Sequence, residues 1–264
     1  MHIVADENIP LIEQFFGDFG DITRVAGRTM TQEDVANADI LLVRSVTQVN
    51  RELLEGSSVK FVGTATIGTD HIDLEYLKEV GIGFASAPGC NAQAVVDYVL
   101  SALSVVVDSR GIDFRDLSVG IVGVGNVGLL LRQRLEQMGL TVLACDPFKE
   151  EDDVGELTTL DKVLGCDVVS LHTPMEKGGD HPTWHLIGEA QLQQMMTDAC
   201  LINACRGAVV DNDALLKHLH DNPDFVAVLD VWEGEPELNR ELLDFCALAT
   251  PHIAGYSLDG KMRG

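Results

Sequence analysis

The sequence predicts an α/β protein with two doubly wound parallel sheets. Short apolar strands alternate with helical segments in both halves of the chain, which is the pattern of parallel strands joined by crossover helices. Hydrophobic residues make up 46% of the composition, aromatic residues only 5%, and the 25 glycines suit tight connections between strands and helices. A chain of 264 residues is long enough for two such domains.

The first domain is predicted over residues 1–98. Its strands are short apolar runs, and the segments between them have helical periodicity. The predicted strands are His2 to Ala5, Ile40 to Val43, Phe61 to Ala65 and Gly83 to Ala85, and the predicted helices are Leu11 to Phe16, Thr31 to Ala36, Arg51 to Leu54 and Leu74 to Val80.

The second domain is predicted over residues 99–254. A single long helix that begins near Asn91 and carries Val95, Val99, Leu103 and Val106 on one face links the two domains. The strand and helix alternation then restarts. The predicted strands are Ser118 to Val122, Thr141 to Cys145, Val168 to His172, Ala199 to Asn203 and Val226 to Val231.

Charge and cysteine content limit the function classes. The net charge of −24 repels nucleic acid and anionic lipid, so we expect neither a nucleic-acid nor a membrane partner. Six cysteines show no CxxC pair and no grouping with histidine, which indicates reduced thiols and no metal site. The N-terminus reads directly as a strand without a leader pattern, so we expect a cytoplasmic protein.

A glycine-rich loop follows the strand Ser118 to Val122 and precedes the helical segment Leu129 to Met138. Its GxGxxG spacing allows a tight turn, a close approach of backbone to a pyrophosphate, and close packing of helix on strand. Plain connections between strands and helices also use such glycines. The candidate cofactor-binding residues of the loop are Gly123, Gly125, Asn126, Val127 and Gly128.

Asp146 ends the next strand, where a carboxylate accepts hydrogen bonds from ribose hydroxyls and repels a 2′-phosphate. We therefore expect NAD in preference to NADP, although nearby Lys149 could soften that preference. Thr173 and Asp230 follow two further strands, at the edge where doubly wound sheets bind ligands. Both are candidate cofactor contacts, and an N-cap or turn role accounts for Asp230 equally well.

Arg206, Glu235 and His252 follow apolar strands in the last quarter of the chain. An isolated histidine after a proline is usually structural, but the chemistry of the three residues is complementary. Removing a hydride from a secondary alcohol also requires a base for the hydroxyl proton, and histidine has the best-matched pKa. Glu235 would stabilise the imidazolium, and Arg206 could hold a substrate carboxylate.

Five segments together resemble the D-isomer-specific 2-hydroxyacid dehydrogenases. They are the loop Gly123 to Gly128 with Asp146, then His172 to Pro174, Asn203 to Asp211, Leu229 to Pro236 and Pro251 to Gly255. The resemblance implies a flavodoxin-like substrate domain, a Rossmann NAD-binding domain, and Arg206, Glu235 and His252 as the catalytic residues. It also implies cofactor contacts from Gly255 and from Cys205, Arg206 and Gly207.

A narrower resemblance, to one group of enzymes within this family, lies in the first domain. It is carried by Ala5 to Pro10, Phe15 to Gly17, Arg44 to Thr47, Phe61 to Asp73 and Pro88 to Ala92. It implies NAD-dependent oxidation of 4-phospho-D-erythronate in vitamin B6 biosynthesis, with Ser45, Thr66 and Tyr256 as substrate contacts. Without the resemblance, Ser45 and Thr66 would be interpreted as turn residues.

Two alternatives stay open: another dehydrogenase of the same build, such as phosphoglycerate dehydrogenase, or a non-catalytic NAD-sensing scaffold. Arg44 is a candidate for holding the substrate phosphate, and a surface salt bridge would explain it as well. Members of the family continue beyond the position of Gly264 with a helix that returns to the substrate domain, and the enzymes of the narrower resemblance carry a further C-terminal dimerisation domain. We therefore expect residues 255–264 to start the return to the first domain, the dimerisation domain to be absent, and the full-length protein to be a homodimer.

Overall fold

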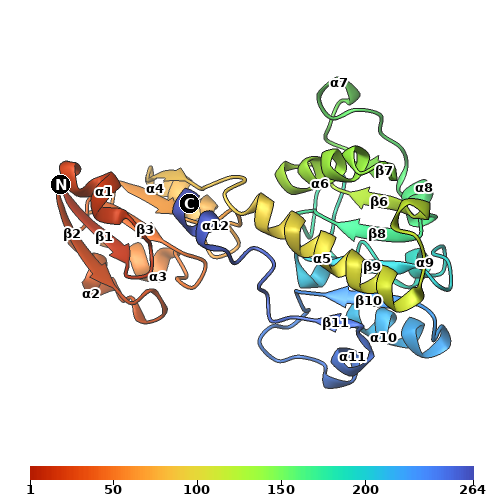
Figure 1. Cartoon of the computed structure of the whole chain (residues 1–264). Helices are drawn as coiled ribbons and strands as arrows, with labels where there is room; N and C mark the ends of the chain where they lie inside the picture. Colours follow the sequence, from red (N-terminus) through yellow and green to blue (C-terminus); the bar gives the residue numbers. More distant parts are fainter. The chain divides into compact units, whose positions relative to one another are not determined.

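The computed structural model describes residues 1–264 except for the side chain of Arg110. The chain forms two compact units. Unit 1 consists of Met1–Asn91 and Tyr256–Gly264, and unit 2 consists of Ala92–Gly255. In Figure 1 the blue C-terminal helix of unit 1 is separated along the chain from its red and orange elements by the whole of unit 2. Each unit contains one parallel sheet, so the predicted fold class is confirmed.

The sheet of unit 1 has five parallel strands in the order β2-β1-β3-β4-β5, which is a flavodoxin-like order. In register, Ile3 pairs with Ile40, and Ile40 pairs with Phe61. The strands are β1 (His2–Asp6), β2 (Asp21–Val25), β3 (Ile40–Val43), β4 (Phe61–Thr64) and β5 (Gly83–Ala85). Strand β2 was not predicted, because it is a largely exposed edge strand with polar residues at alternate positions.

Helices cover both faces of this sheet. Along β1, Val4 packs in one hydrophobic cluster, whereas Ile3 and Ala5 pack in another. This alternation is expected for a strand that is buried on both sides. The helices are α1 (Ile12–Phe16), α2 (Gln32–Val35), α3 (Arg51–Leu54), α4 (Leu74–Val80) and α12 (Leu258–Arg263), with short 3-10 turns at Gly17–Phe19 and Gly27–Thr29.

The sheet of unit 2 has six parallel strands in the order β11-β10-β9-β8-β6-β7. Strand β7 lies on one side of β6 and strand β8 on the other, so the order in which strands are added reverses at β6. Ligands of doubly wound sheets bind at such a switch point, beyond the carboxyl ends of the strands. The strands are β6 (Ser118–Val122), β7 (Thr141–Cys145), β8 (Val168–Leu171), β9 (Cys200–Asn203), β10 (Val226–Leu229) and β11 (Leu248–Ala249).

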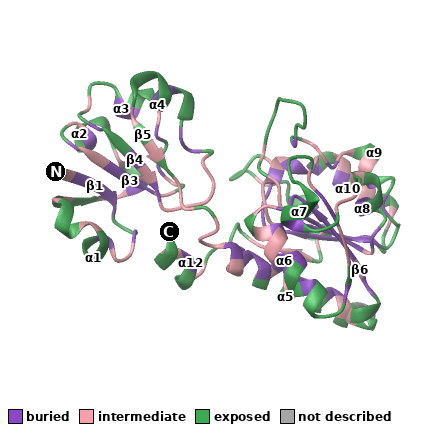
Figure 2. Cartoon of the chain, turned by 90° about the horizontal axis from the view of Figure 1, so that it is seen from above, coloured by how far each residue is buried: buried purple, intermediate pink, exposed green. Residues whose placement is uncertain are grey.

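Helices flank this sheet, and Figure 2 shows its strands largely buried, in purple, while the helices around it carry buried, intermediate and exposed residues. The long helix agrees with the single helix predicted from Asn91 onward. The helices are α5 (Ala92–Arg110), α6 (Asn126–Gln137), α7 (Glu151–Val154), α8 (Leu160–Leu164), α9 (Glu189–Leu192), α10 (Asn212–Asp221) and α11 (Arg240–Phe245), with 3-10 turns at Phe114–Asp116 and Gly207–Val209.

Helix α5 is long and apolar enough to cross a membrane by length and composition, with a mean hydropathy of 1.3 over Ala92–Ser109. Val99 and Leu103 are fully buried in one hydrophobic cluster with Ile121 of β6, as in the core helix of a globular domain. The boundary expected at residues 98 and 99 falls inside this helix. The whole of α5 belongs to unit 2, because its apolar face packs on that unit's sheet.

Candidate functional site

The glycine loop after β6 has the geometry that its spacing predicts. Gly123 has a φ of +90°, and a Cβ there would lie 2.6 Å from the carbonyl oxygen of His172. A Cβ on Gly128 would lie 1.9 Å from the carbonyl oxygen of Gly123, so helix α6 packs directly on the loop. Around Gly125, the described residues leave the position of a Cβ open within 4 Å. The loop is tight where the protein packs and open where a pyrophosphate would approach.

Helix α6 begins directly at this open position. Gly125 is its N-cap and supplies no side-chain oxygen to the first N–H groups of the helix. Twelve residues of helix therefore direct their positive dipole end toward the space beside Gly125, which suits a phosphate group. Asn126 and Val127 form the first turn.

Asp146 connects the loop to strand β7. One carboxylate oxygen accepts a hydrogen bond from the Val124 N–H at 2.8 Å, and the other accepts one from the Phe148 N–H at 3.0 Å. Asp146 is half-buried, and each oxygen keeps lone pairs for further donors. The residues therefore fit a dinucleotide whose ribose hydroxyls donate to Asp146. Lys149 is exposed on the adjoining loop.

His172 and Thr173 follow β8. Burial lowers the pKa of His172 to about 4, so this imidazole is neutral, and its Nε2 lies 2.9 Å from the Ser170 hydroxyl. Thr173 lies beside the thiol of Cys205, whose pKa is raised by burial. The loop after β8 therefore meets the loop after β9 at the edge where a cofactor is predicted, and the contact of Thr173 with a cofactor stays a prediction.

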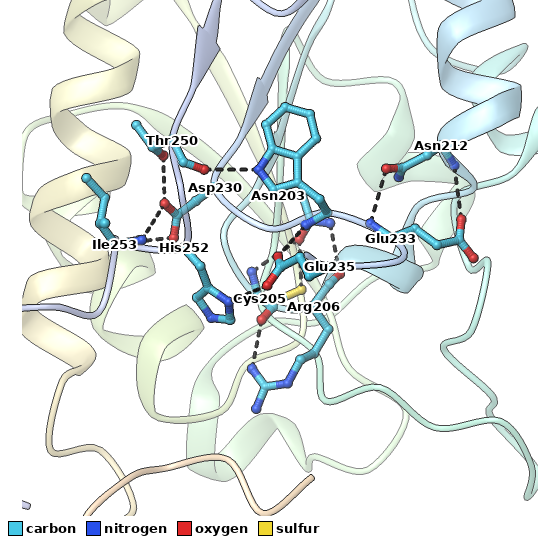
Figure 3. A network of polar contacts seen from close by, with 12 residues as sticks. Asn203, Cys205, Arg206, Asn212, Asp230, Glu233, Glu235, Thr250, His252 and Ile253 are labelled. Atoms are coloured by element: carbon cyan, nitrogen blue, oxygen red, sulfur yellow. Dashed lines mark hydrogen bonds and ion pairs between the residues drawn. The ribbon is translucent and has the colours of Figure 1, made fainter. Parts of the chain in front are cut away.

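The structure brings Glu235 and His252 together. His252 Nδ1 lies 3.1 Å from Glu235 Oε2, while Glu235 Oε1 accepts a hydrogen bond from the Trp232 N–H at 2.7 Å. In Figure 3 the imidazole of His252 points toward the carboxylate of Glu235, and the side chain of Arg206 lies on the same side of the network. The remaining ring nitrogen of His252, Nε2, is the atom free to accept a proton from a substrate.

Asp230 holds the segment that carries His252. It is 1% exposed, and its carboxylate accepts hydrogen bonds from the Ile253 N–H at 2.7 Å, the Ala254 N–H at 2.8 Å and the Thr250 hydroxyl at 2.6 Å. His252 itself has a φ of 57°, and its N–H donates to the Asp230 carbonyl at 2.7 Å. The turn role weighed for Asp230 therefore has direct structural support, and its cofactor contact stays a prediction.

Arg206 is placed by the loop after β9. The Asn203 amide donates to the Arg206 carbonyl at 2.9 Å, and the Asn203 side-chain oxygen accepts from the Cys205 N–H at 3.1 Å. A Cβ on Gly207 would lie 2.0 Å from the backbone of Trp232, so the loops that carry Arg206 and Glu235 are in direct backbone contact. Only glycine at position 207 permits this approach.

The three charges of this site act on one another. Burial alone would raise the pKa of Glu235, but hydrogen bonds from His252 and the Trp232 N–H outweigh it and lower that pKa. The hydrogen bond to Glu235 raises the pKa of His252 above its usual value against the effect of burial, while the charge of Arg206 lowers it. The pair is a carboxylate that stabilises an imidazolium, which is what a proton-accepting histidine requires.

Replacing Glu235 by glutamine is expected to move the acid limb of the pH profile for alcohol oxidation to lower pH. As the predicted proton acceptor, His252 must be neutral, so the expected activity rises as pH increases through the histidine pKa. Because Glu235 raises that pKa, its loss lowers it. The measurement is kcat/KM against pH for the wild type, Glu235→Gln and the exposed neighbour control Glu237→Gln, and an unmoved limb in Glu235→Gln would contradict the pairing.

The predicted substrate residues lie in unit 1. Ser45 is exposed after β3. Thr66 follows β4, and its hydroxyl lies 2.8 Å from that of Thr64, which in turn contacts the buried His71 at 2.9 Å. Tyr256 is 65% exposed and contacts Lys261. Lys261 is not apparent as a site residue from the sequence, because a lysine in a short terminal helix carries no motif of its own.

A further cluster, also missed from the sequence, joins three loops of unit 2. His185 Nε2 lies 2.7 Å from Glu233 Oε1, and its Nδ1 lies 3.5 Å from Asp211 Oδ2. The ligand atoms of these three residues lie within 4.8 Å of one another, close enough to bind a metal ion. The contacts of the imidazole with the two carboxylates also account for the cluster without a metal ion. The expectation of no metal site therefore stays a prediction.

Comparisons with known proteins show which family the chain resembles. The model for "D-isomer specific 2-hydroxyacid dehydrogenase, NAD binding domain" matches residues 105–254. The chain is 58% identical over 265 residues to erythronate-4-phosphate dehydrogenase of Pseudomonas putida (strain W619), covering 100% of this chain and 70% of the relative. It is 57% identical, with the same coverage, to erythronate-4-phosphate dehydrogenase of Pseudomonas syringae pv. syringae (strain B728a).

Solved structures share the fold. D-lactate dehydrogenase from Aquifex aeolicus, in complex with NAD and lactic acid, superposes with a TM-score of 0.83 at 25% identity and covers 100% of this chain and 92% of that one. NAD-bound 3-phosphoglycerate dehydrogenase of Entamoeba histolytica gives a TM-score of 0.85 at 22% identity, with coverage of 100% and 91%.

Proposed function

Because the chain belongs to the D-isomer specific 2-hydroxyacid dehydrogenase family, we propose that it oxidises 4-phospho-D-erythronate to (R)-3-hydroxy-2-oxo-4-phosphooxybutanoate with NAD. This membership confirms the resemblance drawn from the motifs. The relatives named erythronate-4-phosphate dehydrogenase support the substrate, and the reaction places the enzyme in the biosynthesis of pyridoxal 5′-phosphate. NAD is the cofactor of the family domain that unit 2 contains.

Three residues of unit 2 have different roles in the reaction. When bound, NAD supplies the nicotinamide that accepts the hydride. Arg206 presents a planar guanidinium, which can hold the substrate carboxylate through two parallel hydrogen bonds. His252 Nε2 takes the hydroxyl proton, and Glu235 stabilises the resulting imidazolium across the 3.1 Å contact. In the reverse reaction the same imidazolium returns the proton.

The observation that carries this proposal is the Glu235–His252 pair held beside Arg206 in the unit that also contains the glycine loop. A substrate panel at fixed NAD tests it. We expect the highest kcat/KM with 4-phospho-D-erythronate and lower values with 3-phospho-D-glycerate and D-lactate. A preference for 3-phospho-D-glycerate would support phosphoglycerate dehydrogenase instead, and NAD binding without turnover of any acid would support a sensing scaffold.

Replacing Asp146 by asparagine is expected to weaken the preference for NAD over NADP by about tenfold or more, since the negative charge that repels a 2′-phosphate is removed. Asparagine keeps one oxygen to accept from the loop N–H groups. The measurement is the ratio of kcat/KM values with NAD and NADP. Lys149→Met serves as the nearby charge control, and an unchanged ratio in Asp146→Asn would remove Asp146 from cofactor selection.

Two parts of the proposal concern the whole protein. We place the enzyme in the cytoplasm, in line with the bacterial metabolic enzymes to which it is related and with the free thiols of its cysteines. We also propose that the protein is a homodimer, as the family resemblance implies. Sedimentation equilibrium tests this, and a monomer at all concentrations would contradict it.

A further inference from the structure

The hydroxyl of Tyr256 in unit 1 contacts one cation, Lys261, and the charge of a second cation, Arg44, acts on it. Lys261 in α12 donates a hydrogen bond to the hydroxyl oxygen of Tyr256, and its ammonium lies 3.8 Å from the centre of that ring. This hydrogen bond lowers the pKa of Tyr256, and the positive charge of Arg44 lowers it further. Arg44 follows β3, far from Lys261 in sequence, and belongs to the same unit.

The positive charge of this cluster is only weakly compensated. Arg44 Nη1 lies 3.9 Å from Asp6 Oδ1, which is too long for a hydrogen bond, and that oxygen already accepts from the Asn8 N–H at 2.8 Å. Among the described residues, Lys261 has no carboxylate within ion-pair distance. Its neighbour Asp259 pairs with Arg263 at 2.9 Å instead.

The donors of the cluster match a phosphate group. The Lys261 ammonium has three N–H donors and uses one on Tyr256, so two remain. Because the Tyr256 oxygen accepts from Lys261, its own proton is free to be donated to an anion. The Arg44 side chain is 22% exposed, so its guanidinium is accessible in part and presents a planar fork of donors. A phosphate dianion accepts hydrogen bonds from all three.

We propose that Lys261, together with Arg44 and Tyr256, binds the phosphate of the phosphorylated 2-hydroxy acid and selects it over unphosphorylated acids. This inference rests on the proposed function and extends its substrate contacts to α12. The packing of α12 sets the position of Lys261. A Cβ on Gly260 would lie 3.2 Å from the Cβ of Asn91, and the Ser257 hydroxyl caps the Gly260 N–H at 3.0 Å.

Lys261→Met tests the proposal, because methionine keeps most of the length and removes the charge. Arg263→Met is the matched control, since it removes a cation from the same helix at a residue whose partner is solvent-exposed Asp259. We expect Lys261→Met to raise KM for 4-phospho-D-erythronate about tenfold or more, as for loss of a hydrogen bond between charged groups, with kcat little changed. KM for unphosphorylated D-erythronate should stay within about twofold in both variants.

Direct binding of inorganic phosphate, measured by titration calorimetry, gives a readout that does not depend on turnover. We expect the wild type and Arg263→Met to bind phosphate, and Lys261→Met and Arg44→Met to bind it at least about tenfold more weakly. If Lys261→Met retained the wild-type KM and phosphate affinity, the inference would be wrong while the proposed function stood. If the wild type released no NADH from 4-phospho-D-erythronate, the proposed function itself would fail.

Discussion

Replacing His252 by alanine is expected to lower kcat for NADH formation by about two to four orders of magnitude, the usual contribution of a positioned general base. The hydroxyl proton would then have to pass to water. The variant lacks the imidazole whose pKa Glu235 raises and whose protonated form Glu235 stabilises. The histidine side chain is 54% exposed, so the fold should tolerate the change. The measurement is steady-state kcat, together with the thermal unfolding midpoint.

His220→Ala is the matched control. His220 also pairs with a glutamate, Glu241 at 3.0 Å, and is 47% exposed in the same unit. It therefore reproduces the loss of an exposed histidine and glutamate pair at a site without a predicted catalytic role. We expect full activity in His220→Ala. Retention of full activity by His252→Ala would show that another group accepts the proton.

Replacing Arg206 by glutamine is expected to lower kcat/KM by about two to three orders of magnitude, because the substrate carboxylate would lose its charged, bidentate partner. The same change should move the acid limb of the pH profile to higher pH, since the charge of Arg206 lowers the pKa of His252 in the wild type. Both results come from one series of kcat/KM measurements across pH.

Two variants make this prediction specific. Arg206→Lys keeps the positive charge but loses the planar guanidinium that donates two parallel hydrogen bonds. It should therefore recover only part of the activity. Arg115→Gln removes an exposed arginine that pairs with Asp113 in the same unit and should leave kcat/KM unchanged. An equal fall in Arg206→Gln and Arg115→Gln would mean that overall charge, and not carboxylate binding, causes the loss.

Much of the fold follows from apolar periodicity. The predicted limits of buried strands such as β3 and β6 agree with the structure, since such strands consist of continuous apolar residues that end at polar or glycine positions. Strand β2 was not predicted, because the exposed polar side chains of an edge strand give little apolar periodicity in the sequence. Helix α6 begins at Asn126, earlier than predicted, because its first turn contains Gly128, a residue that sequence reasoning assigns to the loop.

The site was predictable in its residue types but not in its supporting contacts. Arg206, Glu235 and His252 stand out because their chemistry is complementary. The role of Asp230 as the hydrogen-bond acceptor for the His252 segment depends on long-range contacts with Thr250 and Ile253, which no local pattern encodes. Lys261 contacts Tyr256 only five residues away, but a lysine in a short helix carries no motif that marks it in the sequence.

The central claim is that this chain transfers a hydride from a 2-hydroxy acid to NAD with His252 as the proton acceptor. Incubation with NAD and 4-phospho-D-erythronate deuterated at carbon 2 tests it most directly, with the nicotinamide analysed by mass spectrometry. We expect deuterium in the reduced cofactor from the wild type and very little from His252→Ala. Reduced cofactor without deuterium, or equal amounts from both proteins, would contradict it.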